Sequence, residues 1–219
     1  MALILCLETA TTNCSVALSK DGVQLELKED KSNNYRNAEK LHVFIDEILK
    51  ENNFAVTDLD AIAVSKGPGS YTGLRIGVST AKGLCFSLDI PLISIATLAS
   101  LAAQVKQEKG YIIPMLDARR MEVYSAVFDQ NLKNIRETKA EVLDENSFIE
   151  FLEKEKTVFI GNGVEKFEAI CKHSNAEFIV DKLPSAREMC SLAEAKYKIS
   201  DTEDVAYFEP YYLKDFIAG

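Results

Sequence analysis

The sequence predicts a mixed α/β fold built from two similar halves, and three observations support that prediction. The 219-residue chain is 47% hydrophobic and 27% charged, with only 10 glycines and 5 prolines, which is typical of a folded protein with a substantial core. Short apolar runs that suit buried strands alternate with stretches whose apolar residues repeat at helical spacing. This succession, strands first and helices later, occurs twice along the chain.

The first half opens with three predicted strands. Residues 3–7 form a continuous apolar run, and residues 14–20 and 23–29 alternate on either side of Asp21-Gly22, a dipeptide typical of a tight hairpin turn. These segments predict an antiparallel meander. The elements expected after it are a helix over 37–50, a strand over 61–64, a glycine-rich turn over 66–71, a helix over 72–88, a strand over 92–95 and a helix over 97–107.

The second half repeats this order after residues 106–110, a polar stretch that ends in glycine. We therefore predict a boundary after residue 108, with an N-terminal subdomain over 1–108 and a C-terminal subdomain over 109–219. The elements expected in the second half are strands over 111–116, 122–128 and part of 133–143, a helix over 146–155, a strand over 158–160, a turn over 161–163 and helices over 164–172 and 185–198.

Charge and cysteine content exclude several classes of protein. The chain has 25 basic and 34 acidic residues and a net charge of −9, which disfavours an independent nucleic-acid-binding role. Five cysteines without a C-x-x-C pair fit neither a disulfide framework nor a zinc site, so we expect them to be reduced, buried and inert. The sequence has no apolar run of membrane-spanning length and no basic signal region at its start, so we interpret the protein as cytoplasmic.

The densest glycine cluster lies between a predicted buried strand and a predicted helix. Backbone amides at such a place can bind phosphate, but neither the Walker sequence nor G-x-G-x-x-G is present. The favoured interpretation is a rigid structural turn, with phosphate binding as the alternative. The residues of this turn are Gly67, Pro68, Gly69 and Gly73.

Small side chains recur every four residues along the predicted helix over 72–88, at Gly73, Gly77, Ala81 and Cys85. Each glycine costs a helix about 1 kcal/mol relative to alanine, so a close contact at this stripe should compensate. Packing against the domain's own sheet and packing against a partner protein are both open at this point.

Residues suited to catalysis or metal binding are few. His42 and His173 are the only histidines, and His42 has no second histidine one helical turn away, so we expect no metal site. Thr9, Thr11 and Thr12 follow the first strand, where related folds bind phosphate, but no glycine there would let a phosphate approach the backbone. These threonines are weak candidates for nucleotide binding. We expect no catalytic residue and no cofactor bound by this chain alone.

The segment Asp117-Ala118-Arg119-Arg120 lies between two predicted strands. One interpretation is a hairpin turn with two solvated cations, and this is favoured. The other is a clamp in which the guanidinium groups hold an anion.

Several segments, taken in order, resemble a known family over nearly the whole chain. They are Leu7-Glu8-Thr9, GPGSYTGLRIG over 67–77, Asp117-Ala118-Arg119-Arg120 with Glu122-Val123-Tyr124, Gly161-Asn162-Gly163 and Pro210-Tyr211-Tyr212-Leu213. In this order they resemble the TsaB (YeaZ) family. The glycine-rich segment is the most specific, since it differs from the usual family form mainly in Tyr71. Departures are Glu8 where Asp is common, Ala10 where Ser is common and Asn37 where many members have His.

The resemblance implies an actin-like (ASKHA) fold of two subdomains and a role in making threonylcarbamoyladenosine in tRNAs that read ANN codons. Members resemble catalytically silent paralogues of the transferase TsaD, with which they form a bundle of helices, and an ATPase, TsaE, joins the complex. ATP or ADP is then expected only at an interface of the complex, and tRNA only through the complex. In the absence of the transferase we expect a homodimer through the same face.

Combined with the helical patterns, the resemblance predicts a partner face on the helices around 41–49 and 72–88, with the small-residue stripe turned outward. The residues expected at this face are Leu41, Phe44, Ile45, Ile48, Gly73, Leu74, Gly77, Val78 and Ala81. The alternative function is an actin-like-fold hydrolase, either metalloprotease-like or a kinase-like ATPase. The missing set of active-site residues argues against it.

Overall fold

The computed structural model of the chain describes residues 1–32 and 37–214 and divides into two compact units. One unit comprises Met1–Ser100 together with the C-terminal segment from Pro184 onward. The other comprises Leu101–Leu183. Each unit is built around one sheet.

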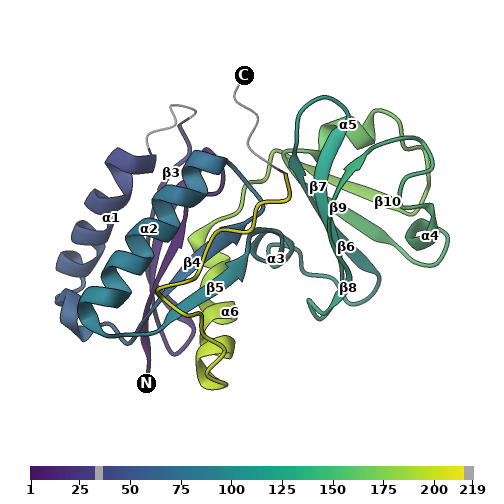
Figure 1. Cartoon of the computed structure of the whole chain (residues 1–219). Coiled ribbons are helices and arrows are strands. Elements are labelled where there is room, and N and C mark those ends of the chain that lie inside the picture. The colour runs from purple at the N-terminus through teal and green to yellow at the C-terminus, as the bar shows by residue number, and fades with distance from the viewer. Residues whose placement is uncertain (33–36, 215–219) are drawn as a thin grey trace. The chain divides into compact units, whose positions relative to one another are not determined.

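The first unit contains five strands that are covered by helices on both faces (Figure 1). Its elements are β1 (Leu3–Glu8), β2 (Cys14–Lys20), β3 (Val23–Asp30), α1 (Asn37–Glu51), the short 3-10 helix η1 (Val56–Asp58), β4 (Ala61–Gly67), α2 (Tyr71–Leu88), β5 (Leu92–Ala96), the start of α3 (Thr97–Ala102) and α6 (Ala186–Lys198). The strand order is β3-β2-β1-β4-β5. The pairs β1-β2 and β2-β3 are antiparallel, as the predicted meander requires, and β1-β4 and β4-β5 are parallel.

The second unit repeats this topology. Its elements are β6 (Tyr111–Asp117), β7 (Glu122–Asp129), β8 (Asn134–Val142), α4 (Ile149–Leu152), β9 (Thr157–Gly161), α5 (Val164–Glu168) and β10 (Ala176–Val180). The order β8-β7-β6-β9-β10 has the same two antiparallel pairs and the same two parallel pairs as the first sheet. The predicted α/β fold of two duplicated subdomains is therefore confirmed.

The first sheet has a separate apolar core on each face. Leu5 and Leu7 of β1 point to the face covered by α1 and α2, whereas Ile4 and Cys6 point to the face covered by α6. Since both faces are covered, β1 is buried at every position, which explains its uninterrupted apolar sequence. All five cysteines are free and buried, as predicted.

Three helices are shorter than predicted, and one strand was missed. The helix expected over 97–107 ends at Ala102, and α4 and α5 consist of one turn each. After Glu168 the Ala169 amide still bonds to the Glu165 carbonyl, but the Ile170 and Cys171 amides both donate to the Phe167 carbonyl, and the helix ends there. The missed strand is β10, whose signal is a run of aromatic and β-branched residues over 178–180.

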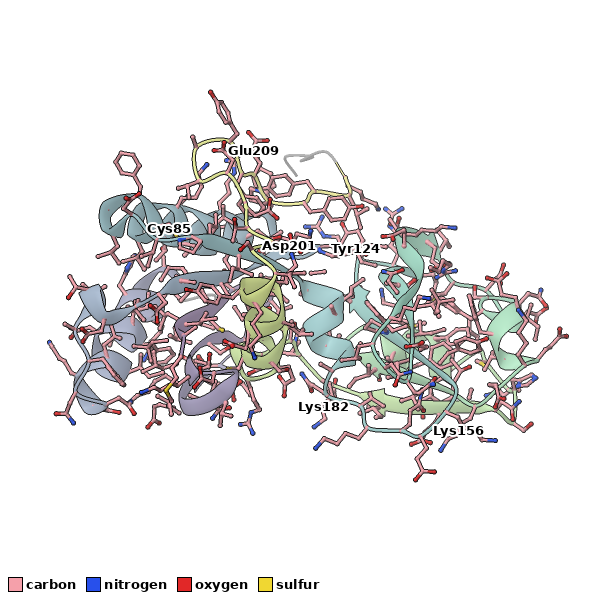
Figure 2. The ribbon with its side chains drawn as sticks, turned by 90° about the horizontal axis from the view of Figure 1, so that it is seen from below. Cys85, Tyr124, Lys156, Lys182, Asp201 and Glu209 are labelled. Carbon is pink, nitrogen blue, oxygen red and sulfur yellow. The ribbon has the colours of Figure 1, made fainter. Side chains whose placement is uncertain are left out.

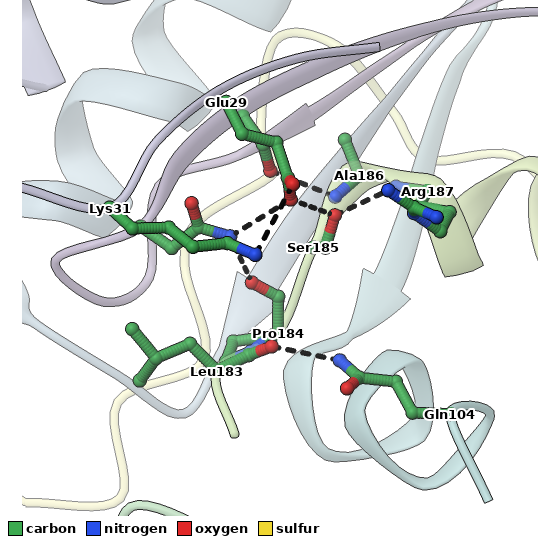
Figure 3. Close-up of polar contacts among 10 residues, drawn as sticks. Glu29, Lys31, Gln104, Leu183, Pro184, Ser185, Ala186 and Arg187 are labelled. Carbon is green, nitrogen blue, oxygen red and sulfur yellow. Dashed lines mark hydrogen bonds and ion pairs between the residues drawn. The ribbon is translucent and has the colours of Figure 1, made fainter. Parts of the chain in front are cut away.

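The compact units differ from the predicted division at residue 108. Helix α6 packs on the sheet of the first unit, so the chain from Pro184 onward belongs with residues 1–100 and not with the second half. The physical reason is visible at the start of α6 (Figure 3): the Ser185 hydroxyl caps the helix and donates to Glu29 Oε1 of β3 at 2.5 Å, and the Ala186 amide donates to Ser15 Oγ of β2 at 2.9 Å. Without α6 the second face of the first sheet would expose its apolar side chains.

The described residues include no helix that is both long enough and apolar enough to cross a membrane.

Candidate functional site

The loop that follows β1 is covered by the glycine-rich turn that follows β4. The Ser70 amide donates a hydrogen bond to the Ala10 carbonyl at 2.7 Å, and a Cβ atom on Gly69 would lie 2.5 Å from that same oxygen. The two turns thus touch at the level of the backbone, which only glycine permits. The Ser70 amide is used in this contact and is not available to a phosphate, which favours the structural interpretation of this turn.

Gly67, at the end of β4, has a left-handed backbone with φ 115°. A Cβ atom at this position would lie 2.6 Å from the carbonyl oxygen of Tyr211 in the C-terminal segment. Gly67 is therefore needed both for its conformation and for a close approach of two backbones. Gly73, which was predicted to belong to the glycine-rich turn, lies instead near the start of helix α2.

Thr9, the first of the three weak nucleotide candidates, is fully buried and contacts α2. Its hydroxyl donates to the Gly73 carbonyl at 2.7 Å. Thr11 is partly exposed, and its hydroxyl accepts a hydrogen bond from the Asn13 amide at 3.3 Å; Thr12 is also partly exposed. Thr9 therefore joins the end of β1 to the start of α2, and its hydroxyl is engaged in that contact.

The small-residue stripe of α2 faces the sheet, which corrects the prediction that it faces outward. A Cβ atom on Gly77 would collide with Thr9 Oγ1, so the absence of a side chain at this position lets α2 approach β1 closely. Of the predicted partner-binding residues, Phe44 is partly exposed. The buried ones are Leu41, Ile45, Ile48, Gly73, Leu74, Gly77, Val78 and Ala81. These eight residues are buried in the free chain and do not line an external face.

The replacement of Gly77 by alanine is expected to destabilise the protein by about 2 to 4 kcal/mol. The new methyl group would displace the Thr9 side chain and break its hydrogen bond to Gly73, which outweighs the gain of about 1 kcal/mol in helix propensity. Chemical denaturation of the two proteins measures the difference. A variant as stable as the wild type would contradict the inward orientation of the stripe.

The opposite side of α2, which we call the α2 outer face and define as Ser79, Gly83 and Phe86, is exposed. Phe86 is 85% exposed, and among the described residues a Cβ atom on Gly83 would meet no atom within 4 Å outside the backbone of its own helix. Val43 of the neighbouring helix α1 is 47% exposed. The strongest apolar repeats of the two helices do not include these residues, so they were not among the predicted partner-binding residues. A large apolar residue on the otherwise polar side of a helix was the available signal.

The C-terminal segment runs alongside α2 and is hydrogen-bonded to it (Figures 1 and 2). Lys82 Nζ donates to the carbonyls of Ala206 and Phe208, at 3.2 and 2.8 Å. Figure 2 labels Glu209 on this segment and Cys85 on α2. Tyr207 is 84% exposed. The α2 outer face is therefore flanked by α1 on one side and by an aromatic-bearing segment on the other.

Glu8, the last residue of β1, is a fully buried carboxyl group. Its Oε1 accepts a hydrogen bond from the Ala10 amide at 2.6 Å, whereas its Oε2 has no hydrogen-bond partner in the described part of the chain. Burial raises the pKa of Glu8 to about 7; the Ala10 amide and the nearby Ser65 hydroxyl offset this only in part. Among the described residues, no three His, Cys, Asp or Glu side chains form a group that could hold a metal ion, at Glu8 or elsewhere.

One family model, two named relatives and one solved structure match this chain over the ranges given below. Residues 34–218 match the model of the TsaD family, described as tRNA N6-adenosine threonylcarbamoyltransferase. A protein from Escherichia coli K12 named tRNA threonylcarbamoyladenosine biosynthesis protein TsaB is 30% identical over 98% of this chain and 96% of its own length. The namesake from Bacillus subtilis is 46% identical over 38% of this chain and 37% of its own. The solved structure of YeaZ from Pseudomonas aeruginosa superposes with a TM-score of 0.84 at 28% identity, over 97% of this chain and all of that one.

Proposed function

The chain belongs to the TsaB (YeaZ) family, and we propose that it is a non-catalytic subunit that activates a TsaD-type transferase. In this proposal the complex adds a threonylcarbamoyl group to the adenine beside the anticodon of tRNAs that read ANN codons. Relatives that are named for the biosynthesis of this nucleoside support the role in tRNA modification.

The observation on which the non-catalytic assignment rests is the closed loop after β1. A nucleotide phosphate bound here would need free backbone amides, whereas the Ala10 amide already donates to Glu8 and the Ser70 amide to the Ala10 carbonyl. Glu8, the acidic residue that ends β1, is fully buried and has no access to a substrate. These contacts favour a subunit that acts through another protein.

The partner that best suits the α2 outer face is the transferase itself. Residues 34–218 match the transferase family model, so the two chains would share a fold and present equivalent faces to each other. Similar subunits commonly pair through the same surface about a twofold axis. An open glycine and an exposed phenylalanine suit a close helix-to-helix contact, and the same face would serve in a homodimer when the transferase is absent.

Further components of the complex complete the proposal. A TsaE-type ATPase joins the pair, ATP or ADP binds only at an interface of the complex, and tRNA is bound only through the complex. The net charge of −9 supports the last point, because phosphate repulsion weakens RNA binding by the isolated chain.

A hydrolase is the second candidate, since one similar solved structure is described as having similarity to peptidase YEAZ. The pKa of about 7 at Glu8 suits general acid–base catalysis, but a fully buried carboxyl lacks access to a peptide.

A binding experiment tests the proposed subunit role. The purified chain and a TsaD-type transferase from the same organism, mixed at about 10 μM each and analysed by light scattering, are expected to form a heterodimer. Two separate species would contradict the proposal.

A further inference from the structure

Two segments of the second unit that are far apart in sequence meet at the tip of the β6–β7 hairpin. The Asp117 amide donates to Asn162 Oδ1 at 3.0 Å. A Cβ atom on Gly163 would lie 3.2 Å from the Asp117 nitrogen and 3.0 Å from a Val123 methyl group, so the two turns are in tight contact. The turn after β9 thus supports the hairpin that bears the two arginines.

Side chains also hold this hairpin in place. The Asp117 carboxylate accepts a hydrogen bond from the Arg119 amide at 2.8 Å and forms an ion pair with Lys166 of α5. Lys166 Nζ also donates to the Glu122 carbonyl at 2.9 Å. The conformation of the tip is therefore fixed before any ligand binds, which lowers the entropic cost of binding.

Arg119 and Arg120 form the tip itself, with left-handed backbone φ angles of 73° and 49°. Ala118 still pairs with Glu122, so these two residues belong to a three-residue loop. A left-handed backbone favours glycine and asparagine, so two arginines are an unfavourable choice here. Both side chains are exposed, and no described residue forms an ion pair with either guanidinium group. The sequence at this tip is therefore better explained by its charge than by the needs of the turn.

We propose that Arg119 and Arg120 bind the phosphate backbone of the RNA substrate within the complex, an inference that rests on the proposed function. Guanidinium groups match phosphate geometry with paired hydrogen bonds, and phosphate contacts position a protein on RNA without reading its sequence. Lys166 is paired with Asp117 and so keeps the tip in shape rather than contributing a free charge. The strongly acidic chain as a whole repels RNA, which confines the contact to this fixed pair.

The test uses the double variant Arg119→Asn/Arg120→Gly, which removes both charges and installs two residues that tolerate a left-handed backbone. The variant is expected to fold with an unchanged or higher melting temperature and to bind the transferase as the wild type does. The affinity of the reconstituted complex for tRNA should fall about tenfold at ~150 mM salt, and the slope of log affinity against log salt should shrink by about 1 to 2.

The matched control is Lys154→Gln/Lys172→Gln, which removes two exposed charges from the same unit and is expected to change tRNA affinity less than twofold. An Asn-Gly variant whose tRNA affinity and salt slope equal those of the wild type would overturn the proposal. So would a loss of transferase binding with RNA affinity per assembled complex intact, because the arginines would then contact carboxylates of the partner. A wild-type chain that forms no complex at all would instead contradict the proposed function.

Discussion

The replacement of Gly83 by leucine is expected to weaken binding of a TsaD-type transferase by at least about tenfold and to leave the melting temperature unchanged or higher. In the described part of the free chain, the Cβ atom of the new side chain has open space beyond its own helix, and leucine favours a helix by about 1 kcal/mol over glycine. In the complex it would occupy the space where two helices should nearly touch. Titration calorimetry and thermal unfolding of the same preparation measure both effects.

Two control variants separate this effect from general damage. Ala195→Leu adds a similar side chain to an exposed position of α6, on the other face of the sheet, and should leave binding unchanged. Gly77→Leu adds it to the buried side of the same helix and should unfold the protein. The placement of the partner face is wrong if Gly83→Leu binds the transferase as tightly as the wild type.

The replacement of Glu8 by glutamine is expected to stabilise the protein by about 2 to 3 kcal/mol at pH 8 and by almost nothing at pH 4. Glutamine keeps an oxygen for the Ala10 amide and can donate to the Ser65 hydroxyl nearby, but it never ionises. Denaturant titrations of both proteins at several pH values measure the difference. The pH dependence is the control, because a mere packing effect would be the same at every pH.

The direction in which stability changes with pH follows from the raised pKa of Glu8. Below a pH of about 4.5 the carboxyl is protonated in the folded and the unfolded chain, so the wild type bears no penalty. Between about 4.5 and about 7 the unfolded chain loses this proton while the folded chain retains it, so stability falls as the pH rises. Above about 7 the penalty is complete. An advantage of the glutamine variant that grew toward acidic pH would contradict the burial of Glu8.

Much of the fold could be predicted from local patterns. Apolar runs and helical repeats located β1 and α2, and the repeated order of strands and helices indicated the duplication that the two sheets display. The return of α6 to the first sheet could not be predicted, because a helical repeat shows which side is apolar but not which sheet it covers. The bonds from Ser185 and Ala186 to β3 and β2 decide that, across more than a hundred residues.

The candidate site was harder to predict than the fold. Gly77 and Gly83 lie in the same helix, and in the sequence they differ only in their position relative to the apolar residues of that helix. The sheet distinguishes them, because a Cβ atom would collide with Thr9 at the first and would have open space at the second within the described part of the chain. The contact of Ser70 with Ala10 joins two turns about sixty residues apart and is invisible to any local pattern.

The most direct test of the proposed subunit role is the rate of threonylcarbamoyl transfer to tRNA in a mixture of a TsaD-type transferase, a TsaE-type ATPase and this chain. We expect product only when the transferase and this chain are both present, no product from this chain alone, and a rate at least about tenfold lower when Gly83→Leu replaces the wild type at a limiting concentration. Product formed by this chain without the transferase would contradict the non-catalytic assignment. A transferase that works equally well without this chain would contradict the activating role.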